Sequence, residues 1–261
     1  MHKLKNIFLV LLIVVFAISS FLFIKELVEN KKENEVFEDL QEIIEKPENS
    51  TNENDNTAVL KNAPSNMLSE NTYNLENIKK INNDVIAWLK IDGTNIDYPI
   101  MQNGDYYLHK NIYKNYSSHG TPYLAYYCDF KKSDNLIIYG HHMKDGTMFS
   151  NLENYKSYNF YKNHKYIKLY TIENGQTIEN IYEVMIAFKT IAYSDEGFKY
   201  YSYTDFKNAE DYEYFVENCR KTEFYYIGVV GTHKDKYITL STCEYSQKNG
   251  RMIVIAKKLL Q

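Results

Sequence analysis

The chain has 261 residues, of which 44% are hydrophobic and 25% are charged, and its formal net charge is −4. These values are ordinary for a globular protein and allow one large domain or two small ones. The weak net charge lacks the basic footprint of nucleic-acid-binding proteins, and the 10 glycines form no phosphate-binding loop. We therefore expect a globular protein with no nucleic-acid partner.

The first segment with a clear pattern is apolar. Residues 7–24, IFLVLLIVVFAISSFLFI, would span ~27 Å as a helix, close to the ~30 Å hydrocarbon core of a bilayer. A cleaved signal peptide would have a shorter apolar region and an A-x-A-like site, which residues 17–19 match only in part. Lys3 and Lys5 favour a cytoplasmic N-terminus. The sequence predicts a cytoplasmic tail (1–6), an uncleaved single-pass anchor and an extracellular remainder.

The composition then becomes polar and acidic over residues 25–72. Apolar residues at helical spacing within residues 33–46 predict a short amphipathic helix. The residues that follow, from Pro47 onwards, are rich in Asn and Ser and indicate a solvated spacer. We expect this segment to hold a folded domain away from the membrane.

The pattern becomes globular from about Tyr73, in a domain that we place at residues 73–261. Apolar residues on one helical face follow Asn74, a possible N-cap, and predict a short first helix. Many short strands with few helices indicate a closed barrel or a sandwich, and periodicity does not choose between them. The strand candidates are residues 86–91, 95–100, 121–127, 135–142, 165–171, 178–190, 236–244 and 251–259, and the helical stretches are 148–164 and 206–221.

The three cysteines are widely spaced and odd in number, which does not indicate a disulfide framework. Cys128 and Cys219 lie among aromatic residues and are predicted to be packing residues. Cys243 instead ends the strand-like run ITLST. Because a strand end holds a side chain rigidly, Cys243 is the candidate nucleophile.

Arg251 follows Cys243 across a polar turn. If the flanking strands pair antiparallel, Arg251 comes close to the thiol and presents a permanent charge with a fork of donors. An inert buried cysteine beside a surface arginine remains the alternative on these residues alone.

His141 and His142 follow Gly140 at the end of another strand candidate. Imidazole is well suited to proton transfer near neutral pH. Since neighbouring residues of a strand point to opposite faces, at most one of the two should share a site with Cys243. A metal site is not indicated, because the pair offers one ligand per face and no CxxC or HExxH spacing occurs.

The remaining histidines of the globular region lie in polar or loop contexts, and we expect them to be solvated. His233 is the reserve candidate for a base, because it lies shortly before Cys243. The other three are His109, His119 and His164.

Together these motifs resemble the sortases, the membrane-anchored cysteine transpeptidases of Gram-positive bacteria. TLSTC matches their TLxTC signature, with a GH-containing strand upstream and an arginine downstream. NIDYPIMQNGDYYLHKNIY, YGHHMKDGTMFSNL, TLSTCEYS and GRMIVIAKKL resemble class B in particular, from about Tyr73 to the C-terminus. The segment SSHGTPYLAYYCDF departs from the GSIFMDY-like version that is frequent in relatives.

The resemblance implies a mostly β fold, an eight-stranded sortase-type β-barrel with an N-terminal helix and short inserted helices. It implies that Cys243 is the nucleophile, His141 the general acid/base and Arg251 the oxyanion stabiliser, with no cofactor and no metal. The positions that resemble the substrate groove are Ser241, Glu244, Tyr139 and Leu108.

The implied partners are surface proteins with a C-terminal sorting signal, NPxTN-like and cleaved after threonine, and a peptidoglycan amino group. The implied location is the cell membrane, with the catalytic domain outside the cell. Two alternatives stay open: a membrane-tethered cysteine protease and a non-catalytic extracellular barrel that binds a ligand. The papain-like C-G-[SA]-C-[WY] signature is missing, and the histidine pair precedes Cys243.

Overall fold

The computed structural model describes residues 2–46, 73–193 and 196–260. Most of the predicted spacer, residues 47–72, therefore lies outside the described residues. Contacts divide the chain into two compact units, Met1–Asp39 and Leu40–Gln261, and each is described by itself.

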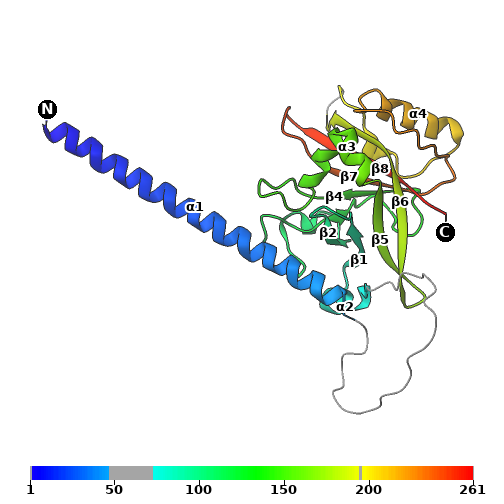
Figure 1. The fold of residues 1–261 in the computed structure, drawn as a ribbon, viewed down its shortest axis with the longest axis horizontal. Coiled ribbons are helices and arrows are strands. Elements are labelled where there is room, and N and C mark those ends of the chain that lie inside the picture. Colours follow the sequence, from blue (N-terminus) through cyan, green and yellow to red (C-terminus); the bar gives the residue numbers. More distant parts are fainter. Residues whose placement is uncertain (1, 47–72, 194–195, 261) are drawn as a thin grey trace, which may run out of the picture. The chain divides into compact units, whose positions relative to one another are not determined.

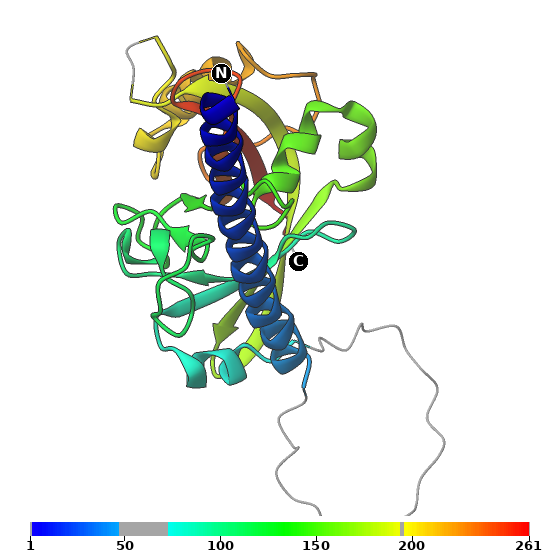
Figure 2. The ribbon, with the colours of Figure 1, turned by 90° about the vertical axis from the view of Figure 1, so that its left-hand side faces the viewer.

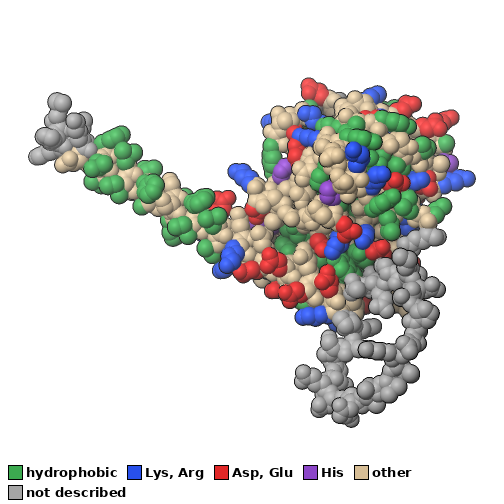
Figure 3. All heavy atoms as spheres, in the orientation of Figure 1, with side chains coloured by type: hydrophobic (Ala, Val, Ile, Leu, Met, Phe, Trp, Pro, Cys, Tyr) green, Lys and Arg blue, Asp and Glu red, His purple; other side chains and the backbone are tan. Residues whose placement is uncertain are grey.

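Helix α1 (His2–Ile44) carries the apolar segment, whose side chains are exposed along it (Figure 3). Its most apolar 18-residue window has a mean hydropathy of 3.2, so α1 is long and apolar enough to cross a membrane, a test that a signal sequence also passes. The amphipathic helix predicted within residues 33–46 is not separate, because α1 continues through it. No glycine or proline occurs before Pro47 to interrupt the helix.

The second unit includes the end of α1. Leu40 and Ile44 are one turn apart and fully buried. Gln41 Nε2 donates a hydrogen bond of 3.1 Å to the carbonyl of Asp97. This compact unit therefore begins at Leu40, well before the boundary at Tyr73 that the sequence suggested.

The second unit is a closed eight-stranded barrel in the order β1-β2-β3-β4-β7-β8-β6-β5, as predicted (Figure 1). Antiparallel pairing of β1 with β5 closes it. The strands are β1 (Val85–Lys90), β2 (Asp97–Met101), β3 (Tyr123–Leu124), β4 (Asn135–Tyr139), β5 (Tyr166–Glu173), β6 (Gln176–Ile191), β7 (Tyr237–Cys243) and β8 (Gly250–Lys258).

Short helices lie between the strands. Asn74 caps α2 by accepting a hydrogen bond of 3.1 Å from the amide of Glu76, as its position before the helix predicts. In both views α2 and α4 lie at opposite ends of the barrel (Figures 1 and 2). The helices are α2 (Leu75–Ile81), α3 (Tyr158–Asn163) and α4 (Ala209–Arg220), with 3₁₀ turns η1 (Tyr106–His109), η2 (Ser150–Lys156) and η3 (Tyr200–Ser202).

Strand β7 lies between β4, to which it is parallel, and β8, to which it is antiparallel. All its residues except Cys243 are buried, and the buried hydroxyls of Thr239 and Ser241 pair with Asn135 and Tyr200 inside the protein. Because the carboxyl ends of parallel strands meet at one edge, the residues that follow β4 emerge beside the end of β7.

Candidate active site

Cys243 and Arg251 are direct partners in the β7–β8 ladder. The amide of Glu244 donates a hydrogen bond of 2.9 Å to the carbonyl of Gly250, which continues the ladder into the turn. Residues directly opposite each other on one face of a sheet are in side-chain contact range. The antiparallel pairing expected from the sequence therefore holds, and backbone register places Cys243 and Arg251 opposite each other.

The turn between β7 and β8 is held by the carboxylate of Glu244, which is 3% exposed. It accepts hydrogen bonds from the amide and hydroxyl of Ser246, at 3.1 and 2.6 Å, and from Lys156 Nζ at 3.0 Å. Burial opposes ionisation, but these bonds outweigh it and lower the pKa of Glu244. Gly250 is required in this turn because a Cβ there would lie 2.3 Å from the Glu244 carbonyl oxygen.

The β4–β7 pairing brings the histidines to the same edge. Tyr139 is the register partner of Ser241, and the amide of Gly140 donates to the Ser241 carbonyl at 3.2 Å. The Thr242 hydroxyl donates back to the Gly140 carbonyl at 2.8 Å. His141 therefore leaves β4 at the level where β7 reaches Cys243.

The half-buried ring of His141 is oriented by the main chain. Its Nε2–H donates a hydrogen bond of 2.7 Å to the carbonyl of Leu108, and its ring stacks on His109 at 5.5 Å. Burial lowers the pKa of His141, against a smaller raising effect of the Leu108 carbonyl, and His109 and His119 lower it further. The ring is thus held neutral at neutral pH, with its proton on Nε2 and a lone pair on Nδ1.

His142 also lies beside residue 243, which the alternation argument did not allow. Its Nδ1–H donates a hydrogen bond of 2.9 Å to the carbonyl of Cys243. Its ring lies 5.1 Å from that of Tyr245, whose hydroxyl donates to the His142 carbonyl. Strand alternation does not apply because β4 ends at Tyr139, before either histidine.

Arg251 faces an aromatic region. Its guanidinium lies 5.8 Å from the ring centre of Tyr193, and its Nη1 donates to the Gly250 carbonyl at 2.9 Å. Burial raises the pKa of Tyr123 to about 12, and Arg251 lowers while Cys243 raises it to smaller extents. The phenol of Tyr123, on β3, therefore lies within electrostatic range of both Cys243 and Arg251. Sequence reasoning missed Tyr123 and Tyr193, whose only signal was the abundance of tyrosine.

The four groove candidates divide into two pairs. Leu108 and Tyr139 are half-buried, and Tyr139 shares a hydrogen bond of 2.6 Å with the hydroxyl of Tyr127. Ser241 is 1% exposed, like the buried Glu244, and its hydroxyl already pairs with Tyr200 at 2.7 Å. Leu108 and Tyr139 remain accessible at the site, whereas the side chains of the other pair are engaged inside the protein.

The other candidate residues lie outside this arrangement, and the sequence described one of them wrongly. Cys128 and Cys219 are buried, burial raises the pKa of both thiols, and both are packing residues as predicted. His119 was expected to be solvated, but it is 1% exposed and pairs with Asp145. Within the described ranges, no group of three or more His, Cys, Asp or Glu side chains is placed to hold a metal ion.

Comparison with known proteins identifies relatives over nearly the whole chain. Residues 89–259 match the Sortase domain. The chain is 30% identical to Sortase B of Staphylococcus aureus, over 98% of its own length and 97% of the relative's. It is 34% identical to Sortase B of Listeria monocytogenes, over 89% and 87% of the two chains.

Solved structures show the same fold. Sortase B of Clostridium perfringens is 31% identical and aligns with a TM-score of 0.64 over 72% of this chain and 100% of that chain. A Staphylococcus aureus sortase B–substrate complex is 33% identical, with a TM-score of 0.61 over 70% and 83%. Sequence and barrel topology agree, and the chain therefore belongs to the sortase family and, within it, to class B, whose members are cysteine transpeptidases.

Proposed function

We propose that this transpeptidase works through a thioester on Cys243, with His141 as general acid/base and Arg251 as the oxyanion stabiliser. The observation that carries this proposal is the register of β7 between its neighbours, which aligns Cys243 with Arg251 and brings the start of the histidine loop to the same edge.

In the first half-reaction, the Cys243 sulfur forms a bond to the substrate carbonyl carbon and the carbon–nitrogen bond breaks. The thiol proton passes through His141 to the departing amine. His141 suits this transfer because burial lowers its pKa, so that it is neutral and able to accept the proton. In the second half-reaction, an acceptor amine displaces the sulfur and its proton returns through His141.

Arg251 supplies the charge for the tetrahedral intermediate. Its cross-strand position opposite the proposed nucleophile supports this role, because a guanidinium there would be near the carbonyl oxygen on which negative charge develops. Removing one such donor typically costs ~3–4 kcal/mol of transition-state stabilisation.

The donor substrates that we propose are surface proteins with an NPxTN-like C-terminal sorting signal, cleaved after threonine. The half-buried Leu108 and Tyr139 would line the groove, while Ser241 and Glu244 hold its supporting strand and turn through internal bonds. Support comes from the solved substrate complex of Staphylococcus aureus sortase B, to which this chain is similar.

The acceptor that we propose is an amino group of peptidoglycan. A solved Staphylococcus aureus sortase B structure contains triglycine, an amine of this kind. The apolar part of α1 would anchor the protein as a single-pass span with residues 1–6 in the cytoplasm, so that donor and acceptor meet at the outer face.

The test uses the full-length protein in detergent micelles with a library of quenched fluorescent peptides. We expect NPxTN-like members to be cleaved after threonine, and hydroxylamine or triglycine to accelerate turnover by capturing the thioester. Cleavage that added amines leave unchanged would instead indicate the protease alternative. A ligand-binding barrel would cleave nothing in the library.

A further inference from the structure

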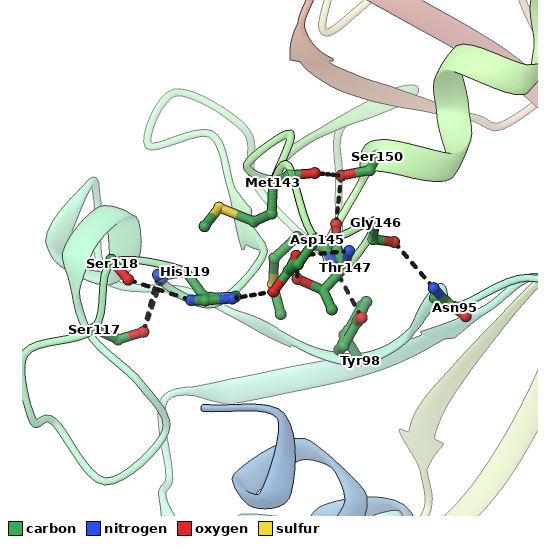
Figure 4. Close-up of polar contacts among 12 residues, drawn as sticks. Asn95, Tyr98, Ser117, Ser118, His119, Met143, Asp145, Gly146, Thr147 and Ser150 are labelled. Atoms are coloured by element: carbon green, nitrogen blue, oxygen red, sulfur yellow. Dashed lines mark hydrogen bonds and ion pairs between the residues drawn. The ribbon is translucent and has the colours of Figure 1, made fainter. Parts of the chain in front are cut away.

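The proposed chemistry does not use a buried histidine–aspartate pair, that of His119 with Asp145. The side chain of His119 is 0% exposed, and its Nε2 lies 3.0 Å from Oδ2 of Asp145, which is 22% exposed. Its Nδ1 lies 3.3 Å from the hydroxyl of Ser118. Figure 4 shows the ring between these two partners, one at each nitrogen. Because a carboxylate only accepts hydrogen bonds, Nε2 of His119 is the donor.

His119 lies in a turn, residues 117–121, that is hydrogen-bonded to residues 107–109. The carbonyl of Leu108 belongs to this second stretch, and the two stretches together form the first of two segments that meet near His141. Ser117 and Thr121 on either side of His119 donate amide hydrogen bonds to the carbonyls of His109 and Tyr107, at 3.1 and 3.0 Å. Gly120 has a φ of +59°, and a Cβ there would lie 2.4 Å from the Leu108 carbonyl oxygen. The turn that carries His119 is therefore packed directly against the carbonyl that holds His141.

Asp145 belongs to the loop that follows His141. Its Oδ1 accepts hydrogen bonds from the amide and hydroxyl of Thr147, at 3.1 and 2.6 Å. The hydroxyl of Ser150 lies 2.6 Å from each of the carbonyl oxygens of Met143 and Thr147, to either of which it can donate its single proton (Figure 4). The amide of Phe149 donates to the His141 carbonyl at 2.8 Å. Asp145 therefore lies in a loop that is held by its own hydrogen bonds and is bonded back to the main chain of His141.

The two segments contact each other through the His119–Asp145 pair, the His141–Leu108 bond and the stacking of His141 on His109. We propose that His119 and Asp145 are positioning residues, which clamp the two segments so that the Leu108 carbonyl stays against Nε2 of His141. This inference rests on the proposed function and extends it. It explains what holds His141 in the one tautomer, protonated on Nε2, that the proposed mechanism needs. A free imidazole would divide its proton between both nitrogens, and only one arrangement leaves Nδ1 as the base.

The direct test is the nitrogen-15 NMR spectrum of histidine-labelled full-length protein, with the His141 signals assigned by their loss in His141→Asn. We expect Nε2 protonation in the unmodified protein and a mixture of tautomers in Asp145→Ala. Turnover of a sorting peptide should fall about ten- to a hundred-fold, as ångström-scale misplacement of a catalytic group does. Asp145→Asn retains an acceptor for His119 and should restore both the single tautomer and most of the rate.

The matched control is Asp92→Ala, which removes an aspartate from a different pair, that of Asp92 with Lys168 at 2.8 Å. His119→Asn removes the same hydrogen bond from the histidine side, since the shorter amide cannot reach Asp145. If Asp145→Ala does not fold, His119→Asn tests the clamp in its place. If the two residues act as one unit, the double variant should be no worse than the worse single variant.

A folded Asp145→Ala or His119→Asn protein with the tautomer and the rate unchanged would overturn the clamp. That failure is distinct from a failure of the proposed function, which would appear as full activity in His141→Asn. The spectrum of His141 reports the clamp even then, because it does not depend on turnover.

Discussion

The two sides of the active site are held by different means. Cys243 and Arg251 sit on neighbouring strands, and their separation is set by a continuous backbone ladder. His141 sits on a loop beyond the end of β4, and side-chain and carbonyl contacts orient it. The proposed nucleophile and oxyanion donor are therefore as rigid as the barrel, whereas the proposed acid/base depends on a few individual hydrogen bonds.

This difference predicts how substitutions in the two parts of the site should affect activity. A substitution on β7 or β8 should remove a function without moving its neighbours, because the ladder persists around it. A substitution in the histidine loops should instead act at a distance, through displacement of an imidazole. The following experiments test this contrast.

The largest effect is expected for the proposed nucleophile, Cys243. Cys243→Ala should reduce peptide cleavage to background, because no other described thiol is exposed at the site. Its melting temperature should stay close to that of the unmodified protein. Cys128→Ala is the control and should retain cleavage, since Cys128 is a buried packing residue. Residual cleavage by Cys243→Ala would remove the thioester from the mechanism.

The next effect separates the two adjacent histidines. His141→Ala should lose about 10²- to 10⁴-fold in kcat, the usual contribution of a general acid/base. His142→Ala should retain most activity and lose only the bond to the Cys243 carbonyl. Steady-state kinetics of both variants decides the assignment. Equal losses would mean that the imidazole beside the Cys243 main chain shares the proton transfer.

The sequence was sufficient for the ladder side because its parts are local. Cys243 and Arg251 belong to one hairpin, so a β-branched run, a polar turn and a second run predict their pairing. The histidine side depends on the parallel β4–β7 pairing, in which His142 meets a residue 101 positions away. No local pattern reveals such a contact, and for the same reason the burial of His119 against Asp145 went unpredicted.

The ends of the elements were also beyond the sequence pattern. The resemblance placed the domain start at Tyr73, but Leu40 and Ile44 are buried in the same compact unit. Their helical spacing was visible in the sequence as an amphipathic face. Which surface such a face contacts is a tertiary property, so the pattern predicted a helix but not its membership of the barrel unit.

A third experiment tests the rigid side again. Arg251→Lys should lower kcat by about 10²- to 10³-fold, since a point charge does not replace the planar fork of donors. The peptide KM should change much less, because the guanidinium acts on charge that develops in the transition state. Arg220→Lys, on α4, is the matched control and should behave like the unmodified protein. Near-normal kcat in Arg251→Lys would exclude the oxyanion role.

The smallest effect concerns the stability of the loop side against acid. Burial lowers the pKa of His141 in the folded protein, whereas in the unfolded chain it should be near the ordinary value of ~6.5. Below that value the unfolded state binds more protons, so stability should fall as the pH decreases from about 6.5 towards the folded pKa. His141→Asn cannot titrate and should show a shallower decline in melting temperature across this interval.

The lowered pKa values of Glu244 and Asp145 affect stability in a more acidic range, because the pKa values of those groups in the unfolded chain are near ~4. Identical declines in both proteins would show that protonation of His141 does not cause the loss of stability in acid. The contrast between a rigid ladder and a proton-sensitive loop would then be wrong for the loop.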